Sequence, residues 1–145
     1  MAEGNGAIYN NFKERILAGD FNLANAGDTL MMMLVSGHTP DIDTHVNYTS
    51  VSGNEYGAGS GYTVGGELLT GQAISQNNTS DRGEFNADDV TWTSLGPLTP
   101  ATPSHAILYS ITASNQLIAY WELGTTATNG GDYTLQFGAT IINVT

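Results

Sequence analysis

The chain has 145 residues and no cysteine, and its 3 Lys and Arg against 14 Asp and Glu give a formal net charge of −11. This length suits one domain, and the lack of cysteine excludes disulfides and thiolate metal sites. The charge opposes binding to nucleic acid and to anionic membranes, because both are bound through cations on the protein. We therefore expect a single domain, residues 1–145, that binds neither, and the strand pattern described below predicts that it is β-rich.

The N-terminal residues have no basic segment followed by an apolar one, so we expect no signal peptide and synthesis in a cytoplasm. The first predicted element is a helix over about residues 8–18, whose apolar face is formed by Ile8, Tyr9, Phe12 and Ile16. Gly19 is placed to cap its C-terminus. Lys13 and Arg15 are two of the three cations in the chain. Such a helix either packs on its own domain or docks on an acidic neighbouring subunit.

After this helix the pattern predicts short strands separated by turns, at Thr29–Val35, Val90–Ser94, His105–Thr112, Leu117–Leu123 and Asp132–Phe137. The first is apolar on both faces, which is typical of a strand covered on both sides. In the fourth, alternation places Leu117, Ala119 and Trp121 inward, with Ile118 and Tyr120 opposite. We predict hairpin turns at Ala113–Gln116 and Asn129–Asp132 and a proline-rich loop at 95–104. The expected fold is mainly β, an antiparallel sandwich or jelly-roll-like domain with one short N-terminal α-helix.

Residues that could carry chemistry do not form a recognised motif. The glycine-rich segment Gly53–Gly66 lacks the lysine of a phosphate-binding loop. Asp41–His45 and the group Asp81, Asp88 and Asp89 hold possible metal ligands without the spacing of a known site. The three histidines, His38, His45 and His105, have no nucleophile or catalytic carboxylate pair at a recognised spacing. We therefore expect no enzyme activity, no cofactor and no resident metal.

Aromatic residues allow a second kind of function. Trp92 and Trp121 alternate in phase with aliphatic neighbours and are expected in the core. Tyr48, Tyr56 and Tyr62 lie in loop-like segments, where they could form a sugar-binding patch or anchor a protein interface. A glycan-binding domain is thus an alternative to a protein-binding one.

The chain resembles a group of small virion proteins of tailed bacteriophages. The resemblance covers most of the chain and is carried by Ile8–Lys13, Gly19–Leu23, Asp28–Leu30, Pro40–His45, Gly59–Gly66, Asp81–Trp92, Leu117–Tyr120 and Gly131–Gln136. Members of this group are generally described only as structural. The resemblance implies a location in the virion, and it supplies no catalytic residues.

With this resemblance, the chain is expected to be a capsid decoration, or cement, protein on the outer surface of the shell. Its expected partners are the major capsid protein and other copies of the chain, with a trimer favoured and a dimer also considered. We expect Phe12, Lys13 and Arg15 to contact the shell, and Ile118 and Tyr120 to mediate subunit pairing. The alternative is a tail- or fibre-associated protein that binds a host glycan.

Overall fold

The computed structural model describes residues 6–97, 102–124, 126–138 and 140–144. Every strand pair in this part of the chain is antiparallel. The largest sheet has five strands, in the order β1 (Gly6–Ile8), β8 (Gln116–Glu122), β7 (His105–Ser110), β2 (Leu30–Val35) and β3 (Glu67–Leu68). The predicted class, mainly β with antiparallel sheets and one short α-helix, is therefore confirmed.

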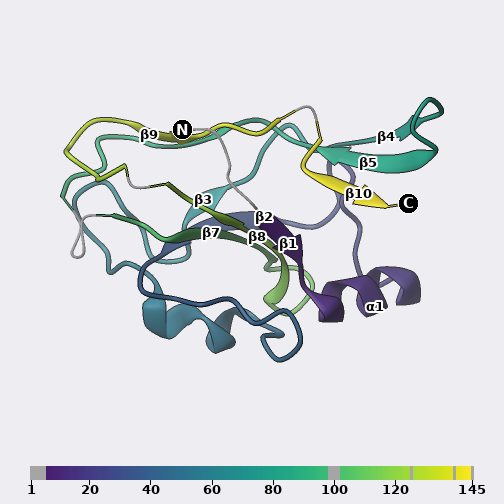
Figure 1. Cartoon of the computed structure of the whole chain (residues 1–145), viewed down its shortest axis with the longest axis horizontal. Helices are drawn as coiled ribbons and strands as arrows, with labels where there is room; N and C mark the ends of the chain where they lie inside the picture. The colour runs from purple at the N-terminus through teal and green to yellow at the C-terminus, as the bar shows by residue number, and fades with distance from the viewer. Residues whose placement is uncertain (1–5, 98–101, 125, 139, 145) are drawn as a thin grey trace.

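Two smaller sheets and three helical segments complete the fold (Figure 1). The three-stranded sheet has the order β10 (Ile142–Val144), β5 (Arg82–Asn86) and β4 (Ala73–Asn77). The two-stranded sheet pairs β6 (Val90–Trp92) with β9 (Tyr133–Leu135). The α-helix α1 spans Asn10–Ala18, and two 3-10 helices, η1 and η2, span Tyr48–Ser50 and Ser52–Asn54.

The central strand β2 is covered on both faces, as its continuous apolar run predicts. On one face Leu30, Met32 and Leu34 belong to the main core, together with residues of both smaller sheets. On the other face Met33 and Val35 pack in a second cluster with Val51 and Tyr48 of the segment that contains η1 and η2, which lies below the sheet in Figure 1. The five-stranded sheet thus lies between the smaller sheets on one side and this segment on the other.

The helix α1 begins at Asn10, two residues later than predicted. Gly6–Ile8 form a strand instead, because their backbone pairs with β8, and Tyr9 donates its N–H to the carbonyl of Ile118 at 3.0 Å. The predicted cap at Gly19 is confirmed, with φ +83° and an N–H directed at the carbonyls of Arg15 and Ile16. Phe12 and Ile16 face the core, as the apolar periodicity indicated.

The strict alternation predicted for residues 117–123 is wrong, because β8 contains a bulge. Leu108 pairs with Ala119 and Tyr109 pairs with Leu117, so Ile118 is an extra residue. The bulge turns Ile118 into the main core, while Leu117 joins the second cluster with Tyr120 packed beside it.

Of the two predicted hairpin turns, Ala113–Gln116 is confirmed as the turn between β7 and β8, with Ser114 and Asn115 at positive φ. Asn129–Asp132 is not a hairpin turn. Its glycines exchange backbone hydrogen bonds with Leu95, at 2.8 and 2.9 Å, and the strand that follows pairs with β6. Residues 98–101 of the predicted proline-rich loop lie outside the described residues.

Candidate protein interface

Two of the predicted contact residues are buried within the chain itself. Phe12 is 1% exposed and packs edge-to-face on Phe21, with ring centroids 4.9 Å apart. Ile118 is 0% exposed, because the bulge in β8 turns it into the core. The prediction that these two side chains contact a partner directly is therefore wrong: neither reaches the surface of the described chain.

The other three predicted contact residues remain accessible. Lys13 is exposed and donates to Asn10 at 2.8 Å. Tyr120 is half-buried, and its ring lies edge-on to those of Tyr9 and His105. Their roles as contact residues stay predictions.

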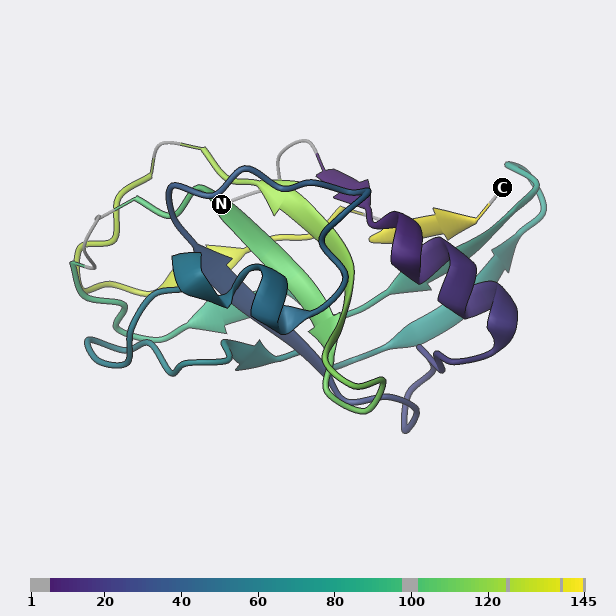
Figure 2. The same cartoon turned by 90° about the horizontal axis from the view of Figure 1, so that it is seen from below.

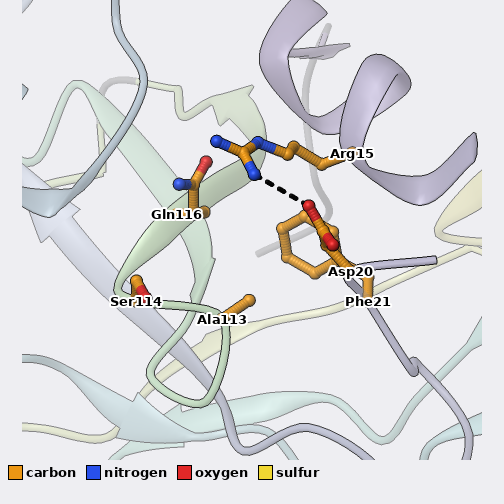
Figure 3. A pocket seen from close by; sticks show the side chains of 6 residues that line it. All are labelled: Arg15, Asp20, Phe21, Ala113, Ser114 and Gln116. Atoms are coloured by element: carbon orange, nitrogen blue, oxygen red, sulfur yellow. Dashed lines mark hydrogen bonds and ion pairs between the residues drawn. The ribbon is translucent and has the colours of Figure 1, made fainter. Parts of the chain in front are cut away.

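Arg15 forms an ion pair with Asp20, with 2.8 Å between Nη1 and Oδ2 (Figure 3). The hydrogen bond to the Asp20 carboxylate raises the pKa of the guanidinium above its usual value. The pair lines an open pocket of about 290 Å³ beside Phe21 and the turn between β7 and β8. Much of the charge of Arg15 is therefore directed at its own chain.

A groove runs between α1 and one face of the three-stranded sheet. Along paired strands, residues that lie side by side share a face. Ile74, Phe85 and Ile142 form one such row, and Gln76, Gly83 and Val144 form the next on the same face. Ile16 of α1 and Leu23 cover part of this face and leave a groove of about 170 Å³, whose lining is almost wholly apolar. We call the surface formed by α1, β4, β5 and β10 the groove end.

Aliphatic side chains are exposed around this groove. Ile74, which lines the groove, is 58% exposed, and Val144, which also lines it, is 56% exposed. A Cβ added at Gly83 would meet no atom within 4 Å, so the absence of a side chain there leaves the groove open. Exposed apolar groups that cluster around a hollow are typical of binding surfaces.

Charge is distributed unevenly between the groove end and the rest of the chain. All three cations of the sequence, Lys13, Arg15 and Arg82, lie on α1 and β5. The carboxylates of Glu14, Asp20, Asp81 and Glu84 accompany them, so the described residues at this end have a net charge of −1. The other ten carboxylates of the sequence have no cation to balance them. Both views place α1, the β4–β5 hairpin and β10 at the same end of the molecule (Figures 1 and 2).

The three histidines lie together near the start of β7, where His105, distant in sequence, meets His38 and His45. His38 stacks on His45 with ring centroids 5.1 Å apart, and His105 lies edge-on to His38 at 6.4 Å. Burial lowers the pKa of His38, and the neighbouring His45 lowers it further, against a raising hydrogen bond with Asn54. Burial also lowers the pKa of His105. The Nε2 atom of His38 is buried without a hydrogen-bond partner in the described structure. Sequence spacing does not reveal this cluster, because the chain reversals between β2 and β7 create it.

A second polar cluster lies within the glycine-rich segment, around Glu55. Its carboxylate accepts hydrogen bonds from the hydroxyl of Tyr48, from the hydroxyl of Tyr62 at 2.8 Å and from the N–H of Gly65 at 2.6 Å. Tyr109 in turn donates to the carbonyl of Gly65 at 2.9 Å. Burial and the Glu55 charge raise the pKa of Tyr109 to about 12, so this hydroxyl is protonated at neutral pH. The cluster binds the glycine-rich loop to the five-stranded sheet.

This cluster also changes the interpretation of the tyrosines proposed as a sugar-binding patch. Tyr56 and Tyr62 are buried in the main core, and Tyr48 is half-buried against Tyr109. Two of the three rings are thus unavailable for stacking on a sugar.

Asp41, Asp88 and Asp89, which were considered as metal ligands, accept hydrogen bonds from the chain itself. Asp41 accepts the N–H groups of Asp43 and Thr44, at 2.9 and 3.2 Å, in a turn. Asp88 accepts from the Thr70 hydroxyl, and Asp89 accepts from the Phe137 N–H. Among the described residues there is no group of three or more His, Asp or Glu side chains placed to hold a metal ion. No helix in the described ranges is long and apolar enough to cross a membrane.

Comparison with protein-family models, with curated proteins and with solved structures finds no significant match to this chain. The groove end is therefore assigned as the candidate interface from its own geometry and charge. Sequence reasoning selected α1 but missed Ile74 and Val144 on the neighbouring strands. The turn-forming run Asn77–Asp81, between Ala73–Gln76 and Arg82–Phe85, is the signal that predicts this hairpin.

Proposed function

We propose that the chain is a structural protein of a bacteriophage particle, a capsid decoration protein that binds the outer shell and bridges major capsid subunits. The observation that carries this proposal is the contrast between the groove end and the rest of the chain. One end is nearly neutral and exposes aliphatic side chains around a groove, and most of the unbalanced carboxylates lie elsewhere on the described chain. The resemblance to small virion proteins of tailed phages supports the same role.

Docking through the groove end follows from the cost of burying charge. Unpaired carboxylates lose hydration when a partner covers them, whereas aliphatic groups gain free energy on leaving water. Burying a Val or Ile side chain completely contributes about 1.5–3 kcal/mol, and Ile74 and Val144 start half exposed. The gain per copy is therefore modest. Attachment to a shell at several points would turn such contacts into stable binding, because linked sites act together.

The acidic remainder would face solvent on the bound particle. Like charges keep free subunits soluble and apart before assembly. The same charge opposes contact with packaged nucleic acid or with a membrane. We thus propose a location on the capsid surface after synthesis in the host cytoplasm. The finer architecture predicted from the sequence, a sandwich or jelly roll, is also kept as a proposal.

Co-sedimentation with expanded shells that lack the protein tests this function. The purified chain is titrated onto shells, and bound copies per shell are counted. We expect saturation at a copy number that matches a symmetry class of the shell. Binding that stays linear with concentration, or no binding at all, would contradict a decoration role.

A further inference from the structure

The strand β4 forms an open edge of the three-stranded sheet. It is hydrogen-bonded to β5 along one side, and no other strand of the described chain pairs with it. Ala73, Ile74, Ser75 and Gln76 are exposed, and Asn77 is half-buried. Alternate backbone N–H and C=O groups along the outer side are therefore open to another strand.

This edge lacks the features that usually prevent strands from pairing between molecules. Edge strands are commonly protected by charged side chains, by proline or by short length. The segment Ala73–Asn77 has five residues, none of them charged and none proline. The strands at the two edges of the five-stranded sheet, β1 and β3, have three and two residues. The β4 edge is thus longer than these and unprotected.

We propose that two copies of the chain pair through this edge, with β4 antiparallel to β4 of the second copy, in a continuous six-stranded sheet. A two-fold axis at Ser75 sets Ala73 opposite Asn77, Ile74 opposite Gln76, and Ser75 opposite its own copy. No like charges meet across this ladder. Such an isologous contact closes after two copies, so it produces a dimer and not the trimer favoured from the sequence.

The distribution of charge favours a second copy of the chain as the partner that pairs with the β4 edge. Two chains of net charge −11 repel each other, and the repulsion is weakest where the fewest unbalanced carboxylates approach. The β4–β5 hairpin lies at the groove end, whose net charge is −1 and which carries every cation of the sequence. This end is therefore where two copies approach at the lowest electrostatic cost.

Pairing around this axis has a consequence that rests on the proposed function. A two-fold axis between antiparallel strands is perpendicular to the sheet, so the same face of both copies points the same way. Because Ile74 lies opposite Gln76, the row of Ile74, Phe85 and Ile142 in one copy continues into the row of Gln76, Gly83 and Val144 in the other, on one surface. A dimer would offer two grooves to the shell at once, and this supplies the multivalent attachment that single modest contacts need.

Sedimentation velocity of the full chain, from about 1 to 200 μM, tests the pairing without any shell. Its result is therefore independent of whether the chain binds a shell. We expect reversible association from 15.3 kDa to twice that mass. The Ser75→Lys variant is expected to raise the dimer dissociation constant by up to about fivefold, because two ammonium groups then face each other across the axis. Within one copy the new lysine lies beside Glu84, its cross-strand neighbour, so the hairpin is preserved.

Thr79→Lys is the matched control, because it makes the same charge change in the exposed turn outside the paired segment. It should leave the association unchanged. A second test uses the lack of native cysteine. Ser75→Cys should form a disulfide-linked dimer under mild oxidation, since paired Cα atoms in antiparallel strands lie within disulfide range, and Thr79→Cys should not. A chain that stays monomeric at 200 μM, a trimer, or a dimer indifferent to Ser75→Lys would overturn the proposal.

Discussion

Replacing Glu55 tests how the glycine-rich loop is held on the sheet. In Glu55→Ala the Tyr48 hydroxyl and the Gly65 N–H lose their acceptor, and the Tyr62 hydroxyl keeps only the Leu34 carbonyl, at 3.5 Å. Hydrogen bonds to a charged acceptor contribute about 1.5–3 kcal/mol each. Tyr48 and Gly65 are half-buried and can gain water, whereas Tyr62 is buried. We therefore expect a loss of about 3–5 kcal/mol in the free energy of unfolding, below the simple sum.

Glu55→Gln separates the loss of charge from the loss of hydrogen bonds. Its amide oxygen can replace Oε1, which accepts from both Tyr62 and Gly65, so a loss of only about 1–2 kcal/mol is expected. Urea denaturation followed by tryptophan fluorescence measures both variants. Glu67→Ala is the control, because Glu67 is half-buried on β3 but has no side-chain hydrogen bond in the described structure. An alanine variant within about 0.5 kcal/mol of the parent chain would refute this account of the loop.

Lowering the pH and replacing a core residue give two further predictions. Because the pKa values of His38 and His105 are lowered in the folded state, the unfolded chain binds more protons, and stability falls as pH drops below about 6.5. The free energy of unfolding should fall by at most about 1.4 kcal/mol per pH unit for each histidine, and His38→Gln should reduce this slope. A free energy of unfolding that stays constant from pH 7 to pH 5 would argue against the cluster. Phe12→Ala should cost about 3–5 kcal/mol by removing a buried ring, and Leu17→Ala on the same helix should change stability by less than about 0.5 kcal/mol. Equal losses of unfolding free energy for Phe12→Ala and Leu17→Ala, measured by chemical denaturation, would contradict the orientation of α1.

Sequence patterns that arise within a single helix or strand predicted much of this fold. The two-sided apolar run at Leu30–Val35 identified a strand covered on both faces, and the 3.6-residue period with Gly19 identified α1. Both signals arise within a single element, so they need no knowledge of the rest of the chain.

Features that depend on distant partners were not predictable in this way. The bulge at Ile118 arises from the pairing of β8 with β7, and it places Ile118 in the main core and Leu117 in the second cluster. β1 forms because β8 offers an open edge, although the same residues extend the helical pattern. The groove joins α1 to strands from the middle and the end of the chain. Such juxtapositions are set by tertiary contacts, which local propensity does not encode.

Shell binding by two matched valine variants tests the central claim most directly. Val144 lines the groove and is 56% exposed, and Val64 lies in the glycine-rich loop outside it and is 52% exposed. Val144→Glu and Val64→Glu therefore add the same charge at equally exposed sites, with little cost to folding expected for either. In co-sedimentation with shells that lack the protein, the account predicts at least tenfold weaker binding for Val144→Glu and unchanged binding for Val64→Glu. Equal binding by the two variants would contradict docking through the groove end.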